Sequence, residues 1–346
     1  MRRSTRLGLV AAALLVLALG GAYTAYWIIA AGQLKDGFAA WAEAMRGQGL
    51  DASWQAARVT GYPFTFRLEL SEVRLRGTAP LGNFDLHAPV VSGSIATSDF
   101  RDWSIAAPQG IDSTLADSRI PFARIAAESA TGAVSVTTAG DTTVWLSLDN
   151  ASAEPTGEPT GRLSAVTANC WVILPNRPAR GHDDRSLGFA ADLHGVGVPS
   201  APAPFSGKLD DLGFGLTLMG DIPAAPARQA AEAWRRAGGT VELDHLGLDW
   251  GNLRITGSGT LALDETLQPV GAFSGAVAGY DQLFAALVKA GRMRQNEAGL
   301  AQLALAIFAK PGPDGRPAIE TSFTIQNGQM YLGPAKLGPA PRIDWR

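Results

Sequence analysis

Apolar positions follow one pattern at the start of the chain and another after it. Residues 7–31, from Leu7 to Ala31, form a stretch of 25 residues without a charge. A helix of that length rises about 37 Å, which exceeds the ~30 Å hydrocarbon core of a bilayer. A cleaved signal peptide has a shorter apolar core followed by a small-residue cleavage site, which is poorly formed here. The stretch therefore predicts an uncleaved transmembrane helix.

The residues around this stretch predict its orientation. Three arginines lie within the first six residues, and positive charge holds a chain end in the cytoplasm. Tyr23, Tyr26 and Trp27 lie near the other end, where aromatic side chains gather at membrane interfaces. We therefore expect residues 1–31 to form a cytoplasmic segment and an anchor, with the rest of the chain on the opposite side.

A second helix is expected over residues 32–49, continuing from the anchor. Leu34, Phe38, Trp41 and Met45 recur at spacings of four, three and four, which places them on one helical face. The glycines of Gly47-Gln48-Gly49 end the helix. The apolar face is expected to pack on the domain that follows, and the membrane surface is the alternative.

Beyond residue 50 the period changes to two, which is typical of half-buried strands. Phe64, Phe66, Leu68 and Leu70 alternate with polar residues, and the apolar positions then change phase at Val73. Such a change of phase indicates a β-bulge or a sharp bend.

Further strands are predicted along the rest of the chain. Cys170 opens an apolar run that predicts a buried strand, Asn327-Gly328 predicts a hairpin turn, and Gly257-Ser258-Gly259 is interpreted as a turn. The remaining alternating runs are Val134–Val136, Val144–Leu148, Phe189–Leu193, Phe214–Leu218, Val241–Leu263 and Phe323–Leu332.

Helical patterns are few and lie late in the sequence. They cover residues 225–237, 281–290 and 294–310, and the last carries an apolar stripe that needs a partner surface, for which the flanking sheet is expected. The stripe consists of Leu300, Leu303, Ala304, Ile307 and Phe308. Loose, Pro-rich composition at 151–160 and 176–185 suggests two β units, residues 50–160 and 161–346.

Composition agrees with a mainly β (α+β) fold: an N-terminal transmembrane helix, then curved, Gly-rich antiparallel sheet with a few packed helices. The chain has 40 glycines and 21 prolines in 346 residues, which disfavours long helical bundles. The net charge of −3 argues against a nucleic-acid partner. With one cysteine, no disulfide within the chain and no cysteine-based metal site can form.

No standard catalytic signature is present. The sequence lacks a Gly-x-Ser-x-Gly elbow, a Walker loop and a His-Glu-x-x-His motif. His182-Asp183-Asp184 is the one compact set of metal-ligand types, and its Arg- and Gly-rich surroundings indicate a solvated loop. We therefore expect a protein that is not an enzyme, with no cofactor, no metal site and no catalytic residues.

Two segments carry a resemblance to a known family. They are Gly61-Tyr62-Pro63-Phe64-Thr65-Phe66-Arg67-Leu68, and Asn327-Gly328-Gln329-Met330-Tyr331-Leu332-Gly333-Pro334 near the C-terminus. With the arginine-capped anchor, they resemble domain-of-unknown-function family 2125 of the bacterial envelope. The Gly-rich strands also resemble, more distantly, AsmA-like envelope proteins. That resemblance implies an anchor in the bacterial inner membrane and a periplasmic curved sheet whose apolar face suits lipid chains.

We therefore expect an inner-membrane-anchored, non-enzymatic periplasmic protein that binds or handles lipid in envelope maintenance or outer-membrane biogenesis. The expected partners are membrane lipid and an envelope protein. An anchored scaffold for an envelope complex and an unrecognised extracytoplasmic hydrolase are the alternatives. The candidate lipid-facing residues are Phe64, Phe66, Leu68, Leu70, Leu246, Leu248 and Trp250.

Overall fold

The computed structural model describes residues 2–79, 82–116, 122–156, 161–199, 207–291, 293–306, 309–311, 317–333 and 335–345. These residues form four helices and 19 strands, and the strand pairs given below are antiparallel, so the expected mainly β class is confirmed. The chain divides into two units, Met1–Ala133 and Val134–Arg346, and each is described separately.

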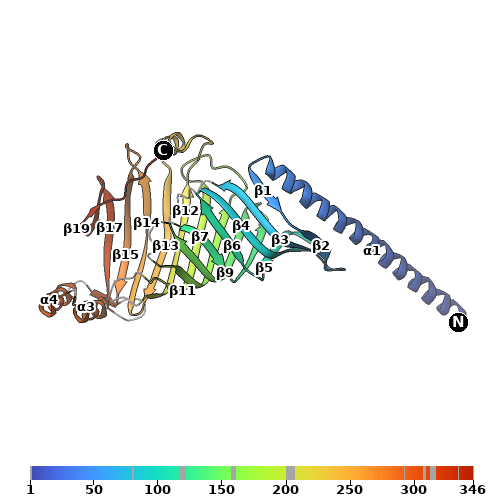
Figure 1. The fold of residues 1–346 in the computed structure, drawn as a ribbon, viewed down its shortest axis with the longest axis horizontal. Coiled ribbons are helices and arrows are strands. Elements are labelled where there is room, and N and C mark those ends of the chain that lie inside the picture. Colours follow the sequence, from blue (N-terminus) through green and yellow to red (C-terminus); the bar gives the residue numbers. More distant parts are fainter. Residues whose placement is uncertain are drawn as a thin grey trace. The chain divides into compact units, whose positions relative to one another are not determined.

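Unit 1 begins with one uninterrupted helix, α1 (Arg2–Arg46), in which the expected anchor and the amphipathic segment are continuous. The helix ends before Gly49, whose φ of +87° suits glycine. From Leu14 onward it is long and apolar enough to cross a membrane, a property shared by anchors and signal sequences. Its C-terminal part lies against strands of unit 1, and its N-terminal part extends away from them (Figure 1).

The strands of unit 1 are centred on two long neighbours, β3 (Thr65–Ala79) and β4 (Gly82–Ala96). Two short strands, β1 and β2, pair with successive halves of β3, and β5 and β6 pair with opposite halves of β4. The remaining bounds are β1 Leu50–Ser53, β2 Ala56–Thr60, β5 Asp99–Ala107, β6 Ile111–Ala116, β7 Phe122–Ala127 and β8 Ser129–Val136, the last crossing the division.

The change of phase after Leu70 is a bend in β3. Glu72 has a φ of +50°, yet the register to β4 does not shift, since Ser71 faces Val90 and Val73 faces Ala88. The bend turns Val73 back toward the face that already holds Leu70, and both side chains are buried. Of the two origins expected from the sequence, the structure therefore has a sharp bend.

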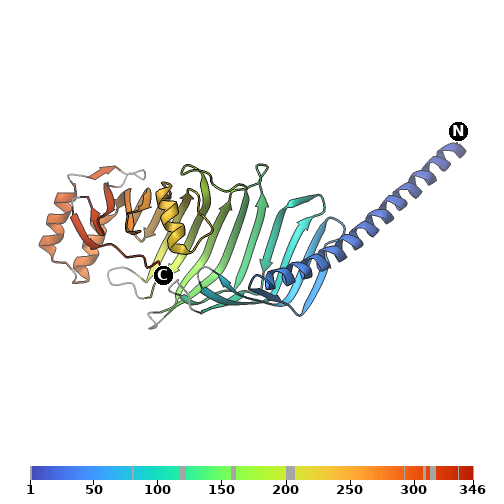
Figure 2. The same cartoon turned by 90° about the horizontal axis from the view of Figure 1, so that it is seen from above.

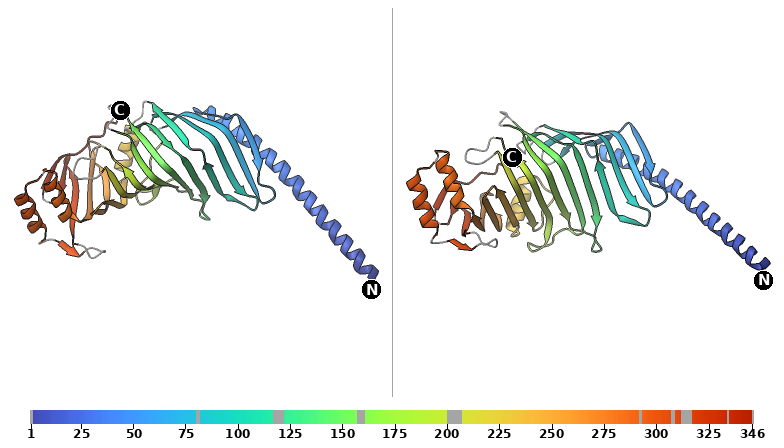
Figure 3. Two further views of the ribbon diagram at one scale, coloured as in Figure 1. Left: turned by 60° about the horizontal axis from the view of Figure 1, so that its bottom comes forward. Right: turned by 90° about the horizontal axis from the view of Figure 1, so that it is seen from below.

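Unit 2 is built mainly from long strands, and most of these strands pair with the next one along the chain. Figures 2 and 3 show them side by side. Their bounds are β9 Thr142–Pro155, β10 Leu163–Leu174, β11 Arg185–Gly197, β12 Lys208–Met219, β13 Thr240–Trp250, β14 Leu253–Leu263, β15 Pro269–Ala278, β16 Ala309–Pro311, β17 Pro317–Gln326, β18 Gln329–Leu332 and β19 Ala335–Pro339. Strand β17 follows β15 in the sheet, and β16 pairs with β17.

The division between the units lies earlier than the boundary at residues 160/161 expected from loop composition. Strand β9 continues to Pro155 and its pairing with β10 extends as far as Ala153, so residues 151–155 are strand. The Pro- and Gly-rich stretch therefore connects two neighbouring strands of unit 2. Residues 157–160 lie outside the described part.

The three late helices are α2 (Ala227–Arg236), α3 (Tyr280–Lys289) and α4 (Gln295–Ala306). Helix α4 is shorter than the expected 294–310, because Ala309–Pro311 pairs as strand β16 with β17. The expectation that its stripe packs on a sheet is wrong for Leu300 and Leu303, which are 68% and 69% exposed. Ile307 and Phe308 lie outside the described residues.

Two predicted turns have different outcomes. Asn327-Gly328 is the hairpin turn between β17 and β18, with φ values of +53° and +67°, as predicted. Gly257-Ser258-Gly259 is strand rather than turn, since it lies inside β14, and the chain reverses instead at Gly251-Asn252. A Cβ at position 259 would lie 2.5 Å from the Ala272 carbonyl oxygen, so glycine permits the close approach of β15.

Candidate functional site

The sheet of unit 2 has one continuous apolar face. The strand registers align apolar side chains from β9 to β17 in a row across the sheet. This first row contains Leu148, Ala168, Leu193, Leu212, Leu248, Ile255, Val277 and Ile319. Seven gaps between eight strands, each of about 4.8 Å, give the row a length of about 34 Å.

Parallel rows on the same face are equally apolar. One contains Val144, Val172, Phe189, Leu216, Leu243, Gly259, Phe273 and Phe323. Aromatic rings meet on this surface, since Phe189 and Phe214 lie 5.8 Å apart, as do Phe273 and Phe323. We call the surface formed by these rows the apolar face of unit 2. It follows from period-two alternation held in register through eight strands.

The opposite face of the same strands is mainly polar, although Trp145 and Trp171 also lie on it. The row next to the first apolar row contains Asp149, Thr167, His194, Asp211, Asp249 and Arg254. His194 pairs with Asp211, and the Arg254 guanidinium lies 2.6 Å from the Asp249 carboxylate. These charged side chains favour contact of this face with water, so the sheet is amphipathic.

The apolar face is not a closed core. In the two apolar rows, only Ala168 is buried among the residues whose exposure the structure describes, and the larger side chains keep part of their surface accessible. Leu146, on the adjacent row, is 38% exposed. A large apolar surface that the described residues leave accessible is typical of a binding surface.

In unit 1 the apolar face of the sheet is covered, because α1 packs on it. Trp27 of α1 stacks on Phe66 with ring centroids 5.4 Å apart, and its indole nitrogen donates to the Thr65 carbonyl at 3.2 Å. Leu34 and Phe38 pack farther along on the cluster of Leu68, Leu70 and Val73, which are buried. These contacts form a closed core.

The predicted lipid-facing residues therefore fall in three places. Leu246, Leu248 and Trp250 lie partly exposed on β13, with Leu246 and Leu248 in rows of the apolar face of unit 2. Phe66, Leu68 and Leu70 are buried under α1, which leaves them no surface for a lipid. Phe64 is 77% exposed in the turn before β3.

The sequence interpretation missed the role of Trp27 and Ala31 in the core of unit 1, where both are buried. The sequence pattern places both within the expected membrane segment Leu7–Ala31. The spacing between these two residues and the amphipathic residues that follow could have indicated that role. Trp27, Ala31, Leu34 and Phe38 continue the spacing of four, three and four, so one helical face extends from the next segment into the end of the apolar stretch.

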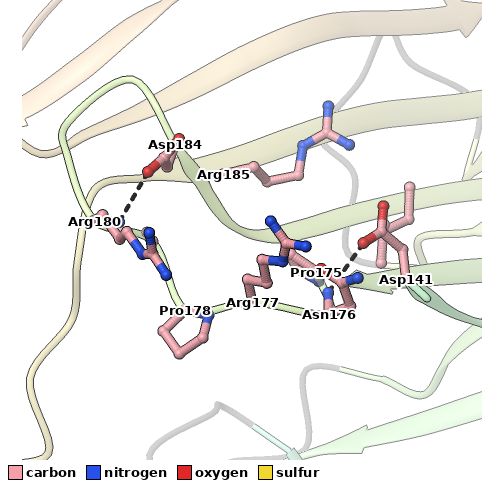
Figure 4. Close-up of a pocket in the computed structure, with 10 residues that line it drawn as sticks. Asp141, Pro175, Asn176, Arg177, Pro178, Arg180, Asp184 and Arg185 are labelled. Atoms are coloured by element: carbon pink, nitrogen blue, oxygen red, sulfur yellow. Dashed lines mark hydrogen bonds between the residues drawn. The ribbon is translucent and has the colours of Figure 1, made fainter. Parts of the chain in front are cut away.

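A second feature of unit 2 is a pocket of about 420 Å³ at the connection between β10 and β11 (Figure 4). Arg177, Arg180 and Arg185 line it, and their guanidinium groups have no ion-pair partner among the described residues. Two acidic residues, Asp141 and Asp184, also line it.

The two carboxylates of this pocket fix the backbone of the connection. Asp141 accepts a hydrogen bond from the backbone amide of Asn176 at 3.0 Å, and Asp184 accepts one from the backbone amide of Arg180 at 2.8 Å. The guanidinium groups therefore keep donors free for an anion such as phosphate or carboxylate.

Other chemistry is sparse in the described part of the chain. His182 pairs only with its neighbour Asp183, and no group of three or more His, Cys, Asp or Glu side chains comes together as a metal site there. Cys170 is partly buried rather than fully buried on β10. Burial, with a contribution from Asp192, raises the pKa of its thiol, which keeps it protonated at neutral pH.

Comparison with known proteins gives one family. The sequence model of the DUF2125 family, described as an uncharacterized protein conserved in bacteria, matches residues 27–341. The match covers nearly all of the chain and begins at Trp27, the residue of α1 that packs on Phe66. Neither the curated proteins nor the solved structures contain a match.

Proposed function

The chain belongs to the DUF2125 family of bacterial proteins, and we propose that it is a non-enzymatic protein, anchored in the inner membrane by α1, that binds lipid on the apolar face of unit 2 in the periplasm. The two apolar rows and the accessible side chains on them carry this proposal. The distant likeness to AsmA-like envelope proteins agrees with it as an analogy of architecture, which does not determine function.

The energetics favour an apolar chain as the ligand. Each methylene transferred from water to an apolar surface contributes about 0.8 kcal/mol. A row of about 34 Å offers room for many such groups beside one another. The polar row on the opposite face keeps the sheet in water while a ligand occupies the apolar side.

The anchor agrees with such a ligand, because it would hold the protein at a source of lipid. The side chains of Leu14, Leu17 and Ile28 are 61–70% exposed in unit 1, a degree of exposure that suits contact with hydrocarbon. The three arginines near the N-terminus would remain in the cytoplasm, which would leave the strands of both units in the periplasm.

Lipid extraction from the purified full chain tests the proposal. Leu248 and Ile255 face each other on the apolar face, and Thr256 lies next in sequence on the polar side. Leu248→Asp and Ile255→Asp should remain folded, because both sites are partly exposed, and should lose bound lipid. Thr256→Asp adds the same charge one residue away and should retain it.

Mass spectrometry of the extracts and circular dichroism of the variants give the two readouts. Wild-type protein without lipid, or equal lipid in all three variants, would overturn lipid binding. A lipid-free wild type that retains a defined envelope protein would favour the anchored scaffold. Turnover of an ester or glycan substrate would favour the hydrolase.

A further inference from the structure

Three large aromatic side chains are exposed at one edge of unit 1. Phe64 is 77% exposed, Phe100 57% and Tyr62 50%. We call these residues the aromatic edge. Each offers more apolar surface to solvent than a soluble surface usually leaves on a side chain of this size, which indicates a contact made outside unit 1.

Strand pairing brings the three residues together. Thr65 at the start of β3 faces Ala96 at the end of β4, and Ala96 faces Asp99 at the start of β5. The Thr97 amide donates to the Phe64 carbonyl at 3.0 Å, which joins the turn before β3 to the turn between β4 and β5. The aromatic edge therefore lies at one end of the sheet, on the turn before β3 and the start of β5.

Side chains of α1 fix the position of the aromatic edge along the helix. The Tyr23 hydroxyl donates to the Pro63 carbonyl, and the hydroxyls of Thr24 and Tyr62 lie 2.7 Å apart. The Trp27 ring meets the Tyr62 ring edge-on, with centroids 5.5 Å apart. The edge is thus bound to α1 between residues 23 and 27.

The same residues lie where the helix must leave the hydrocarbon. Trp27 and Ala31 are only 9% and 8% exposed because unit 1 covers them, so lipid cannot reach them. A span of 20 residues crosses about 30 Å, and counted from Leu7 it ends at Tyr26. The helix therefore reaches the bilayer surface at the level of the aromatic edge.

We propose that the aromatic edge is a second membrane contact, with Phe64 and Phe100 inserted into the interfacial layer of the bilayer from which α1 emerges. Aromatic side chains favour this layer. Asp99 and Arg101 lie beside Phe100 with 3.9 Å between their charged groups, and a polar headgroup layer accepts such a pair. The inference rests on the proposed anchor and adds a contact to it.

Site-specific labels in the full chain can separate this contact from the anchor. Cys170 is the only cysteine, so Cys170→Ser provides a background for single cysteines at positions 17, 64, 100 and 256. Each carries an environment-sensitive fluorophore, and the protein is reconstituted into phosphatidylethanolamine–phosphatidylglycerol vesicles with or without a spin-labelled lipid quencher. Leu17 reports the anchor, and Thr256, exposed on the polar side of unit 2, is the control.

We expect the lipid quencher to reduce fluorescence at positions 17, 64 and 100 and to leave position 256 unchanged. Quenching at 17 without quenching at 64 and 100 would overturn the aromatic edge as a membrane contact while the anchor stands. Absence of quenching at 17 would overturn the anchor, and the further inference with it. Aqueous iodide gives the converse readout, with strong quenching expected only at 256.

Discussion

Replacing Phe66 by alanine should strongly destabilise unit 1, whereas the same change at Phe64 should not. Phe66 is 3% exposed and stacks on Trp27 at 5.4 Å, while Phe64, two residues earlier, is 77% exposed. Truncating a buried phenylalanine costs about 3–5 kcal/mol, including the cavity that remains. An exposed site without such contacts usually changes stability by less than about 0.5 kcal/mol.

Guanidinium chloride unfolding of the full chain in detergent micelles, followed by tryptophan fluorescence, measures both effects. An m-value of about 4 kcal/mol per molar converts the expected loss into a midpoint lower by about 1 M for Phe66→Ala. Because the chain has two units, the transition that contains the Trp27 signal is the one to compare. Equal midpoints for Phe66→Ala and Phe64→Ala would refute the helix-covered core of unit 1.

Three further predictions concern unit 2. Gly328→Ala should destabilise the β17–β18 hairpin by about 1–2 kcal/mol, because position 328 has a φ of +67°; hydrogen exchange of the β18 amides measures this. The pKa of Asp264 is lowered: burial raises it, but hydrogen bonds from Gln268 and Thr266 outweigh burial. The ionised Asp264 should therefore stabilise the fold fully above the unfolded pKa near 3.8, and this effect should disappear as pH falls through the lower folded pKa. An NMR titration of the Gln268 backbone amide follows this loss, and Asp264→Ala should remove the pH dependence. The raised pKa of Cys170 should make its thiol react with iodoacetamide more slowly at pH 8 than a cysteine introduced at exposed position 166, as read by mass spectrometry.

Much of the fold could be predicted because its pattern is local. Period-two alternation identifies strands without knowledge of their partners, and Asn327-Gly328 specifies a turn by its backbone preference alone. The interior of β14 could not be predicted in this way. Glycine at 257 and 259 has the composition of a turn, and only the approach of β15 explains it as strand.

The candidate site could be predicted in part for a related reason. Alternation places Leu246 and Leu248 on an apolar face, but it cannot say whether another element covers that face. Phe66 and Leu68 have the same alternation and lie under α1. Cover depends on contacts between segments distant in sequence, here about 40 residues apart between Trp27 and Phe66.

The continuity of α1 limits how unit 1 can move if the helix spans a membrane. A flexible linker would let a domain sweep a hemisphere around its attachment point, with a reach that grows with linker length. Here the helix continues to Arg46 without a break, and the sheet of unit 1 and its turns contact the helix from Tyr23 to Phe38. Tilting the helix would then incline the sheet of unit 1 by the same angle, so a bilayer thickness that changes the helix tilt would also change the sheet's angle to the bilayer.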